Sequence, residues 1–282
     1  MLRSYRLKFG TYLRILLILG VSACQTLKKS SEDDKKADDI LNTQKSLVIN
    51  YINQGQPNMA LREIRPLEKQ YPKDADLKNL TGLIYLSTQN SKAALNYFEQ
   101  AYHLDPRAPI ALNLSSALIE SGQSVRAIKV LKDLKASPAG KAYQYPERID
   151  HNIGLAAERM KKLDIAEKYY KRALATNPYY YISLMRLGTL YQSEKKAGSA
   201  YTQFSKAHES CLKCFEPVQA MVQMQAGAGK TAYASKLIQE YLIDKELEPR
   251  DRAKAQQLLS WSQNQNHSQA QGSTKPTSVR TQ

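Results

Sequence analysis

The sequence predicts an all-α fold, an array of six helical hairpins closed by a C-terminal helix. The main evidence is a small residue that recurs at intervals of 34, 33, 39, 34 and 34 residues. Four positions after each one comes a bulky apolar or aromatic residue, as Phe98 follows Ala94. The recurring small residues are Ala60, Ala94, Ala127, Ala166, Ala200 and Ala234. Self-similarity at this period indicates stacked helical units, each of which completes the core of its neighbour.

The spacing within each repeat places the small and large residues on one face of each of two helices. The first helix has a small residue at position 8 and a Tyr at position 11, as at Gly82 and Tyr85. The second helix has its small and large residues four positions apart, which puts them on one face. Small residues let the two helices approach closely, and the large residue fills the groove beside them. Three of the repeats close with a proline, at Pro72, Pro106 and Pro178.

A small residue, an aromatic residue and a terminal proline at a period of 34 are typical of the tetratricopeptide repeat. This resemblance implies a right-handed superhelix of six hairpins over residues 41–262. The repeats are expected to begin near Leu41, Ala75, Ala108, Glu147, Tyr181 and Phe215. A last helix, about Pro249 to Trp261, would cap the array with Ala253, Leu258 and Trp261 on one face. The polar tail, residues 263–282, is expected to be disordered.

The first 23 residues are typical of an export signal. Residues 1–14 carry four basic and no acidic side chains, and the apolar segment at 15–20 is too short to span a membrane. The sequence Val-Ser-Ala-Cys ending at Cys24 resembles a bacterial lipobox, which implies a lipidated Cys24 at the start of the mature chain. Ordinary cleavage beside an unmodified cysteine is the alternative. Gln25 replaces the Asp that retains lipoproteins at the inner membrane, which favours the outer membrane, with residues 24–40 as a charged tether.

Composition agrees with an exported helical protein. The chain has a net charge of +15, and about +11 remains after the signal is removed. For an exported protein, anionic lipid, cell-wall polymer or an acidic protein segment suits this charge better than nucleic acid, and solvated lysine faces are the alternative. The sequence from Met224 to Thr231 ends like a phosphate-binding loop but lacks its first glycine and preceding strand. The four histidines fit no metal-ligand spacing, so we expect no catalytic residues, cofactor or metal.

Two of the three cysteines remain once Cys24 is assigned to lipid. Cys211 and Cys214 lie in the turn between the fifth and sixth repeats, where the closing proline is missing. A redox pair would require a different fold, and a haem-attachment motif would require His at the position of Phe215. In an oxidising compartment we therefore expect a structural disulfide between Cys211 and Cys214.

A second face of each first helix, at positions 2, 5, 9 and 12, lines the concave groove of tetratricopeptide proteins. In the first four repeats this face is unusually apolar, with polar points at Lys45, Asn79 and Arg148. The candidate partner-binding residues are Ile49, Ile52, Leu83, Leu86, Leu112, Ile119, His151 and Leu155. Position 12 can instead pad the core between repeats, which is the alternative for Ile52, Leu86 and Ile119. The fifth and sixth repeats carry polar residues at Thr189, Gln192, Gln219 and Gln223. The N-terminal half is therefore predicted to bind a helical or extended peptide.

One stretch resembles a known family more specifically. This stretch is similar to the fourth and fifth repeats of exported type IV pilus lipoproteins of the PilF, PilW and Tgl kind. The residues that carry the similarity are Tyr145-Pro146, Asn152 to Gly154, Tyr170, Asn177-Pro178 and Leu190-Tyr191. This resemblance implies an outer-membrane pilotin, which binds the secretin subunit and promotes its insertion and multimerisation. We expect the protein to be monomeric. The alternative is an adaptor that docks peptidoglycan enzymes or outer-membrane assembly components.

Overall fold

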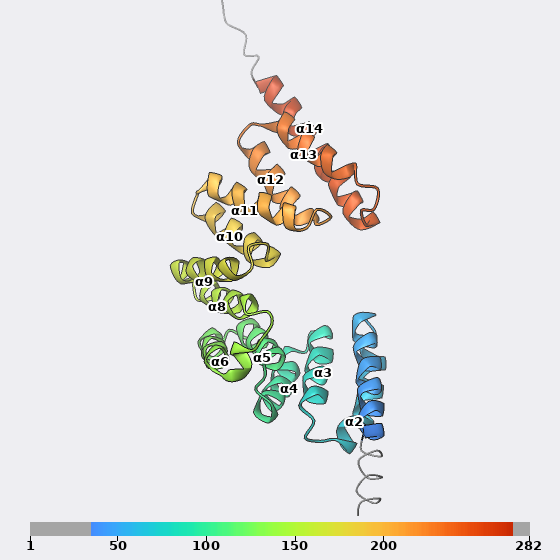
Figure 1. The fold of residues 1–282 in the computed structure, drawn as a ribbon. Helices are drawn as coiled ribbons and strands as arrows, with labels where there is room; N and C mark the ends of the chain where they lie inside the picture. Colours follow the sequence, from blue (N-terminus) through green and yellow to red (C-terminus); the bar gives the residue numbers. More distant parts are fainter. Residues whose placement is uncertain (1–34, 273–282) are drawn as a thin grey trace, which may run out of the picture. The chain divides into compact units, whose positions relative to one another are not determined.

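The computed structural model describes residues 35–272, and the described part of the chain is helical throughout, with no strand (Figure 1). The predicted signal, Cys24 and most of the tether lie outside these residues, as do residues 273–282. Among the helices described, none is long and apolar enough to cross a membrane.

The chain divides into two compact units, Met1–Pro106 and Arg107–Gln282. The helices of the N-terminal unit are 35–53, α2 (Pro57–Gln70), α3 (Ala75–Ser87) and α4 (Ser91–Leu104). Those of the C-terminal unit are α5 (Ala108–Glu120), α6 (Ser124–Ala136), α7 (Pro138–Lys141), α8 (Glu147–Arg159), α9 (Leu163–Thr176), α10 (Tyr181–Ser193), α11 (Ala197–Ser210), α12 (Phe215–Gly227), α13 (Thr231–Leu242) and α14 (Pro249–Gly272).

Helix starts coincide with five of the six predicted repeat starts. Helices α3, α5, α8, α10 and α12 begin at Ala75, Ala108, Glu147, Tyr181 and Phe215. The first helix begins at residue 35, earlier than the predicted Leu41. Each first helix is followed by a second helix, so the described chain consists of paired hairpins.

Close contact between the paired helices explains why position 8 is small. A methyl group added at Gly82 would lie 2.6 Å from the ring of Phe98, and one at Gly188 would lie 2.6 Å from Phe204. Carbon atoms in ordinary contact lie about 3.5–4.0 Å apart. The glycine on the first helix and the aromatic ring on the second therefore fit together as one packing unit, repeated along the chain.

The interval of 39 residues holds an additional one-turn helix, α7. Ser137 caps it by accepting a hydrogen bond from the Gly140 backbone N–H at 3.1 Å. The chain then runs through residues 142–146 before α8 begins. The longer interval is thus an insertion between the third and fourth repeats.

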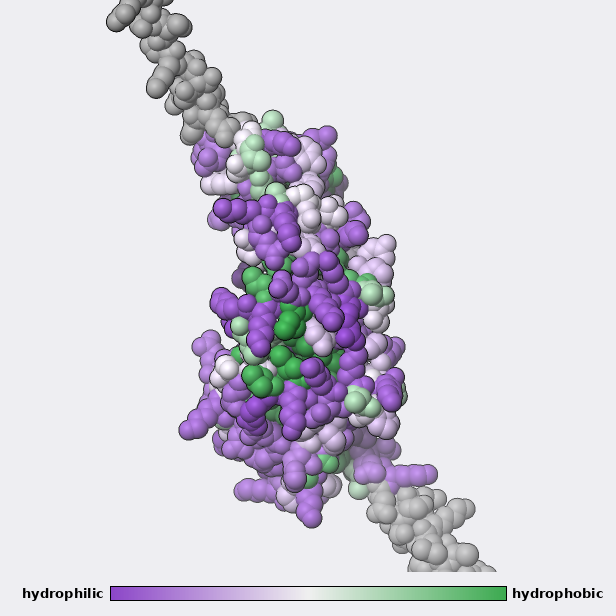
Figure 2. Space-filling model, turned by 90° about the vertical axis from the view of Figure 1, so that its left-hand side faces the viewer, coloured by the Kyte–Doolittle hydropathy of each residue, from purple (hydrophilic) through white to green (hydrophobic). Residues whose placement is uncertain are grey.

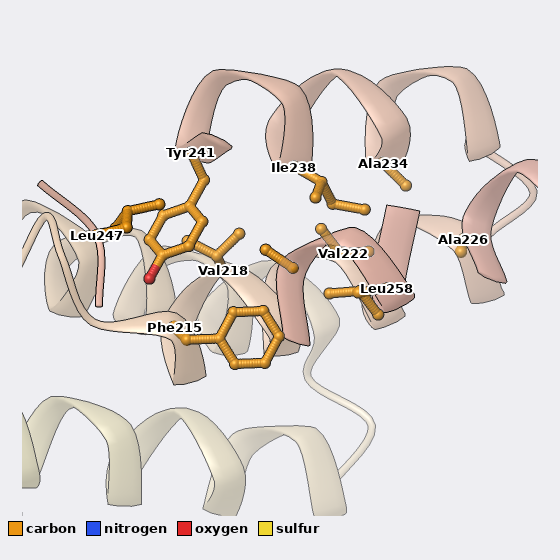
Figure 3. Packing of buried hydrophobic residues seen from close by; sticks show 10 residues of the cluster. Phe215, Val218, Val222, Ala226, Ala234, Ile238, Tyr241, Leu247 and Leu258 are labelled. Carbon is orange, nitrogen blue, oxygen red and sulfur yellow. The ribbon is translucent and has the colours of Figure 1, made fainter. Parts of the chain in front are cut away.

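Helix α14 closes the last repeat by covering the cluster in Figure 3, where Phe215, Val222 and Ile238 are buried together. The side chains of α14 on this side are Ala255 and Leu258. The predicted packing face was therefore wrong in part: Ala253 and Trp261 are exposed. Ala255, Leu258 and Ser262 are three and four residues apart, which defines the buried face.

Helix α14 also extends further than predicted, to Gly272 instead of Trp261. The expectation of a disordered tail from residue 263 is wrong for residues 263–272, which are helical. No proline or glycine interrupts the sequence between Ser262 and Gly272, so nothing ends the helix earlier.

Candidate partner-binding surface

The first-helix face, defined as positions 2, 5, 9 and 12 of each first helix, is partly open in the N-terminal unit. Ile49 has 44% of its surface exposed. Ile52 and Leu83 are half-buried and pack against the core cluster of this unit, and Leu86 is half-buried as well. These four predicted residues thus offer apolar surface, with Ile49 the most exposed.

Three predicted residues of the C-terminal unit are buried instead. Leu112, Ile119 and His151 have only 8%, 4% and 4% of their surface exposed. Helix α5 packs against both α6 and α8, which covers its side chains from two sides. For Ile119 this burial matches the core-padding alternative. Leu155 on α8 stays half-buried.

His151 connects two first helices rather than facing a partner. Its Nδ1 lies 2.9 Å from the Oγ of Ser183 on α10, and its ring contacts Tyr170 and Tyr180 at centroid distances of 5.4 and 5.5 Å. Burial, together with the positive charge of Arg186, lowers the pKa of His151 to about 4. The imidazole is therefore neutral at neutral pH.

The predicted polar points have different roles. Lys45 donates hydrogen bonds to Asp74 at 2.7 Å and Asp76 at 3.4 Å, which ties helix 35–53 to the start of α3. Arg148 is exposed, and its guanidinium lies over the ring of Tyr145, 4.9 Å from the centroid. Lys45 is thus engaged within the protein, whereas Arg148 faces outward.

The fifth repeat is less polar than predicted. Thr189 and Gln192 are exposed, as expected, but Ile182 at position 2 is 47% exposed and Met185 at position 5 is half-buried. The same repeat phase applied to positions 2 and 5 of this repeat would have identified both. Figure 2 shows apolar residues gathered on one face, with polar residues around them.

Comparison with known proteins agrees with this architecture. Family models described as tetratricopeptide repeat match residues 46–109 and 151–180. The chain contains tetratricopeptide repeats in these two stretches. It resembles the type IV pilus proteins PilF and PilW.

Two solved structures share most of the fold. The first is the structure of PilW, described as a widely conserved type IV pilus biogenesis factor. The match covers 76% of this chain and 96% of the PilW chain, with a TM-score of 0.62 and 18% identity. The second is the structure of Pseudomonas aeruginosa PilF. The match covers 78% of this chain and 97% of the PilF chain, with a TM-score of 0.61 and 16% identity.

A sequence relative points the same way. The type IV pilus assembly protein PilF of Pseudomonas aeruginosa is 25% identical over 167 residues. The match covers 57% of this chain and 64% of that protein, which is less than two thirds of its length.

The remaining predicted sites fall at turns of the tetratricopeptide array. The Cys211 and Cys214 sulfurs are bonded, with the Cα atoms 5.3 Å apart, and the two residues end α11 and precede α12. The segment that ends like a phosphate-binding loop spans the end of α12 and the turn before Thr231. Within the described residues, no group of His, Cys, Asp and Glu is arranged to hold a metal ion.

Proposed function

We propose that this protein is a type IV pilus assembly factor that binds the secretin subunit and promotes its insertion and multimerisation in the outer membrane. The observation that carries this proposal is the combined likeness to PilF, in sequence over 167 residues and in fold. The fold of PilW, matched over 96% of that chain, supports it. Tetratricopeptide arrays act as protein-binding scaffolds, so the expected role is assembly rather than catalysis.

The predicted lipid on Cys24 would hold the array at the membrane in which the secretin assembles. More than one acyl chain is needed for stable anchoring, which a bacterial lipoprotein cysteine supplies. Helix 35–53 begins eleven residues after Cys24. At most about 3.3–3.6 Å per residue, this tether reaches no further than roughly 40 Å. The first repeat would therefore stay close to the membrane surface.

The partner would contact the exposed apolar part of the first-helix face. In the N-terminal unit these residues are Ile49, Ile52, Leu83 and Leu86; in the C-terminal unit they include Leu155. Apolar side chains on a repeat array suit an amphipathic helix or an extended segment of the partner. Complete burial of one such side chain contributes about 1.5–3 kcal/mol, so several such contacts together would offset the entropic cost of association.

Deletion of the gene tests the proposal. Heat-resistant secretin multimers should disappear from outer-membrane fractions while secretin monomers remain, and a plasmid copy of the wild-type gene should restore the multimers. Multimers at the wild-type level in the deletion strain would contradict the proposed function. Recovery of a cell-wall hydrolase with the protein in that case would favour the adaptor alternative.

A further inference from the structure

We propose that Tyr143, Tyr145, Arg148, Tyr179 and Ile182, here called the aromatic shelf, bind an acidic peptide segment that also carries apolar or aromatic side chains. The identity of the protein that supplies this segment, the secretin, rests on the proposed function. The chemistry of the segment follows from the residues of the shelf.

The insertion between the third and fourth repeats builds one side of the shelf. Tyr143 and Tyr145 lie in the segment between α7 and α8, with ring centroids 5.9 Å apart in an edge-to-face arrangement. Tyr145 is exposed. The insertion occurs in one of the five intervals, so these two aromatic residues have no counterparts at the other repeat junctions.

The start of α10 builds the other side. Tyr179 and Ile182 are 67% and 47% exposed. Tyr180 between them turns inward, edge-on to the ring of His151 on α8, and His151 in turn contacts Ser183 on α10. These contacts connect α8 to the start of α10.

Electrostatics also place the two sides within reach of each other. Burial raises the pKa of Tyr180, and the charges of Arg148, Glu147 and Tyr143 act on it as well. Arg148 and Tyr143 belong to the insertion side, whereas Tyr180 belongs to α10. The segment that carries Tyr179 and Ile182 therefore lies next to the insertion, because Tyr180 in this segment contacts His151 of α8.

The shelf presents positive charge. Arg148 is exposed, stacks on Tyr145, and takes part in none of the ion pairs of the described chain. The nearest carboxylates in sequence, Glu147 and Asp150, are buried. Lys135, with Nζ 2.5 Å from Asp150, offsets the charge of that carboxylate. An acidic group on the partner would thus form an ion pair with the exposed Arg148.

The same residues favour a polypeptide over a glycan. Tyr and Arg are enriched among the residues that dominate the binding energy of protein interfaces. A sugar ring could also stack on Tyr145, but the aliphatic surface of Ile182, continued by half-buried Met185, suits an apolar side chain better than hydroxyl groups. The favoured ligand is therefore an acidic peptide with apolar anchors.

Fluorescence anisotropy with the full chain in detergent tests the binding chemistry. The probe is a fluorescein-labelled twelve-residue peptide of alternating Asp and Phe, and the comparison peptides replace Asp with Lys or Phe with Ser. We expect binding of the first peptide alone, weakened at least about tenfold by Arg148→Glu and by Tyr145→Ala. A tenfold loss corresponds to about 1.4 kcal/mol. Arg159→Glu, an equal charge change at the exposed end of α8, is the matched control and should leave binding unchanged.

The proposal is overturned if the Asp-Phe peptide does not bind, if Arg159→Glu weakens it as much as Arg148→Glu, or if soluble peptidoglycan fragments displace it. Circular dichroism of each variant confirms that the helices remain folded.

Secretin multimers in cells separate this proposal from the proposed function. Loss of multimers in both the deletion strain and the Arg148→Glu, Tyr145→Ala double variant supports both. Loss in the deletion strain alone refutes the aromatic shelf and leaves the proposed function intact. Multimers that persist in the deletion strain, combined with peptide binding that depends on Arg148, refute the proposed function and leave the shelf intact.

Discussion

The contact between Gly188 and Phe204 allows a sharp test of how the repeats are held together. A Cβ atom at position 188 would meet the Cε1, Cδ1 and Cζ atoms of Phe204 at 2.6, 2.8 and 3.0 Å. The ring is buried and cannot swing into solvent. It would have to retreat by roughly 1 Å to restore ordinary contact distances. Overpacking of this kind costs about 1–3 kcal/mol.

Replacement of glycine by alanine also stabilises a helix, by up to about 1 kcal/mol, and this gain must be separated from the overpacking. Gly198 in α11 supplies the control, because nothing lies within 4 Å of an added Cβ there. Urea unfolding followed by circular dichroism should therefore show Gly188→Ala less stable than Gly198→Ala by about 1–3 kcal/mol. Phe204→Leu combined with Gly188→Ala should recover part of the difference. If Gly188→Ala and Gly198→Ala are equally stable, the close contact does not explain the glycine.

Three further predictions concern His151 and the cysteines. The pKa of His151 is lowered to about 4 in the folded protein against 6.5 for an unperturbed imidazole. The contribution of neutral His151 to the free energy of unfolding should thus be present in full above about pH 6.5. The free energy of unfolding should fall by about 2 kcal/mol between pH 7 and pH 5, because the unfolded chain takes up a proton at this residue. Urea titrations of the wild type and His151→Gln at several pH values check this, since the variant should lose this decrease in the free energy of unfolding. If the free energy of the variant falls with pH as in the wild type, His151 is not the group responsible. Cys24→Ala should block acyl labelling and remove the protein from outer-membrane fractions, and an unchanged membrane pool would rule out the lipid anchor. Cys211 and Cys214 should resist alkylation until reductant is added, whereas immediate labelling of both would show free thiols.

The helix starts could be predicted because the repeat signature is local. A small residue at one position and a ring sixteen residues later are enough to define two helices and the face on which they meet, as for Gly188 and Phe204. This pair occurs for α3, α8 and α10, whereas the starts of α5 and α12 follow from the recurring Ala spacing of 33 and 34 residues.

Exposure on the first-helix face could not be predicted in the same way. Repeat position specifies the direction of a side chain, but burial depends on how closely the next repeat packs. Leu112 and His151 occupy equivalent positions and are buried, because α5 packs against α6 and α8 and because His151 contacts Tyr180 and Ser183 at the start of α10. Met185 at the same position stays half-buried. The sequence also places Tyr143 and Tyr145 in a long interval, but their contact with Arg148 depends on how the insertion folds.

Site-specific photo-crosslinking in cells tests the central claim most directly, namely that the first-helix face of this protein contacts the secretin. A photoreactive residue at exposed Ile49 should crosslink to the secretin subunit. The same residue at Val125, which is 68% exposed on the second helix α6, should not. Both variants must support normal secretin multimers, which shows that they are folded and active. A secretin crosslink from Val125 and none from Ile49 would contradict the account.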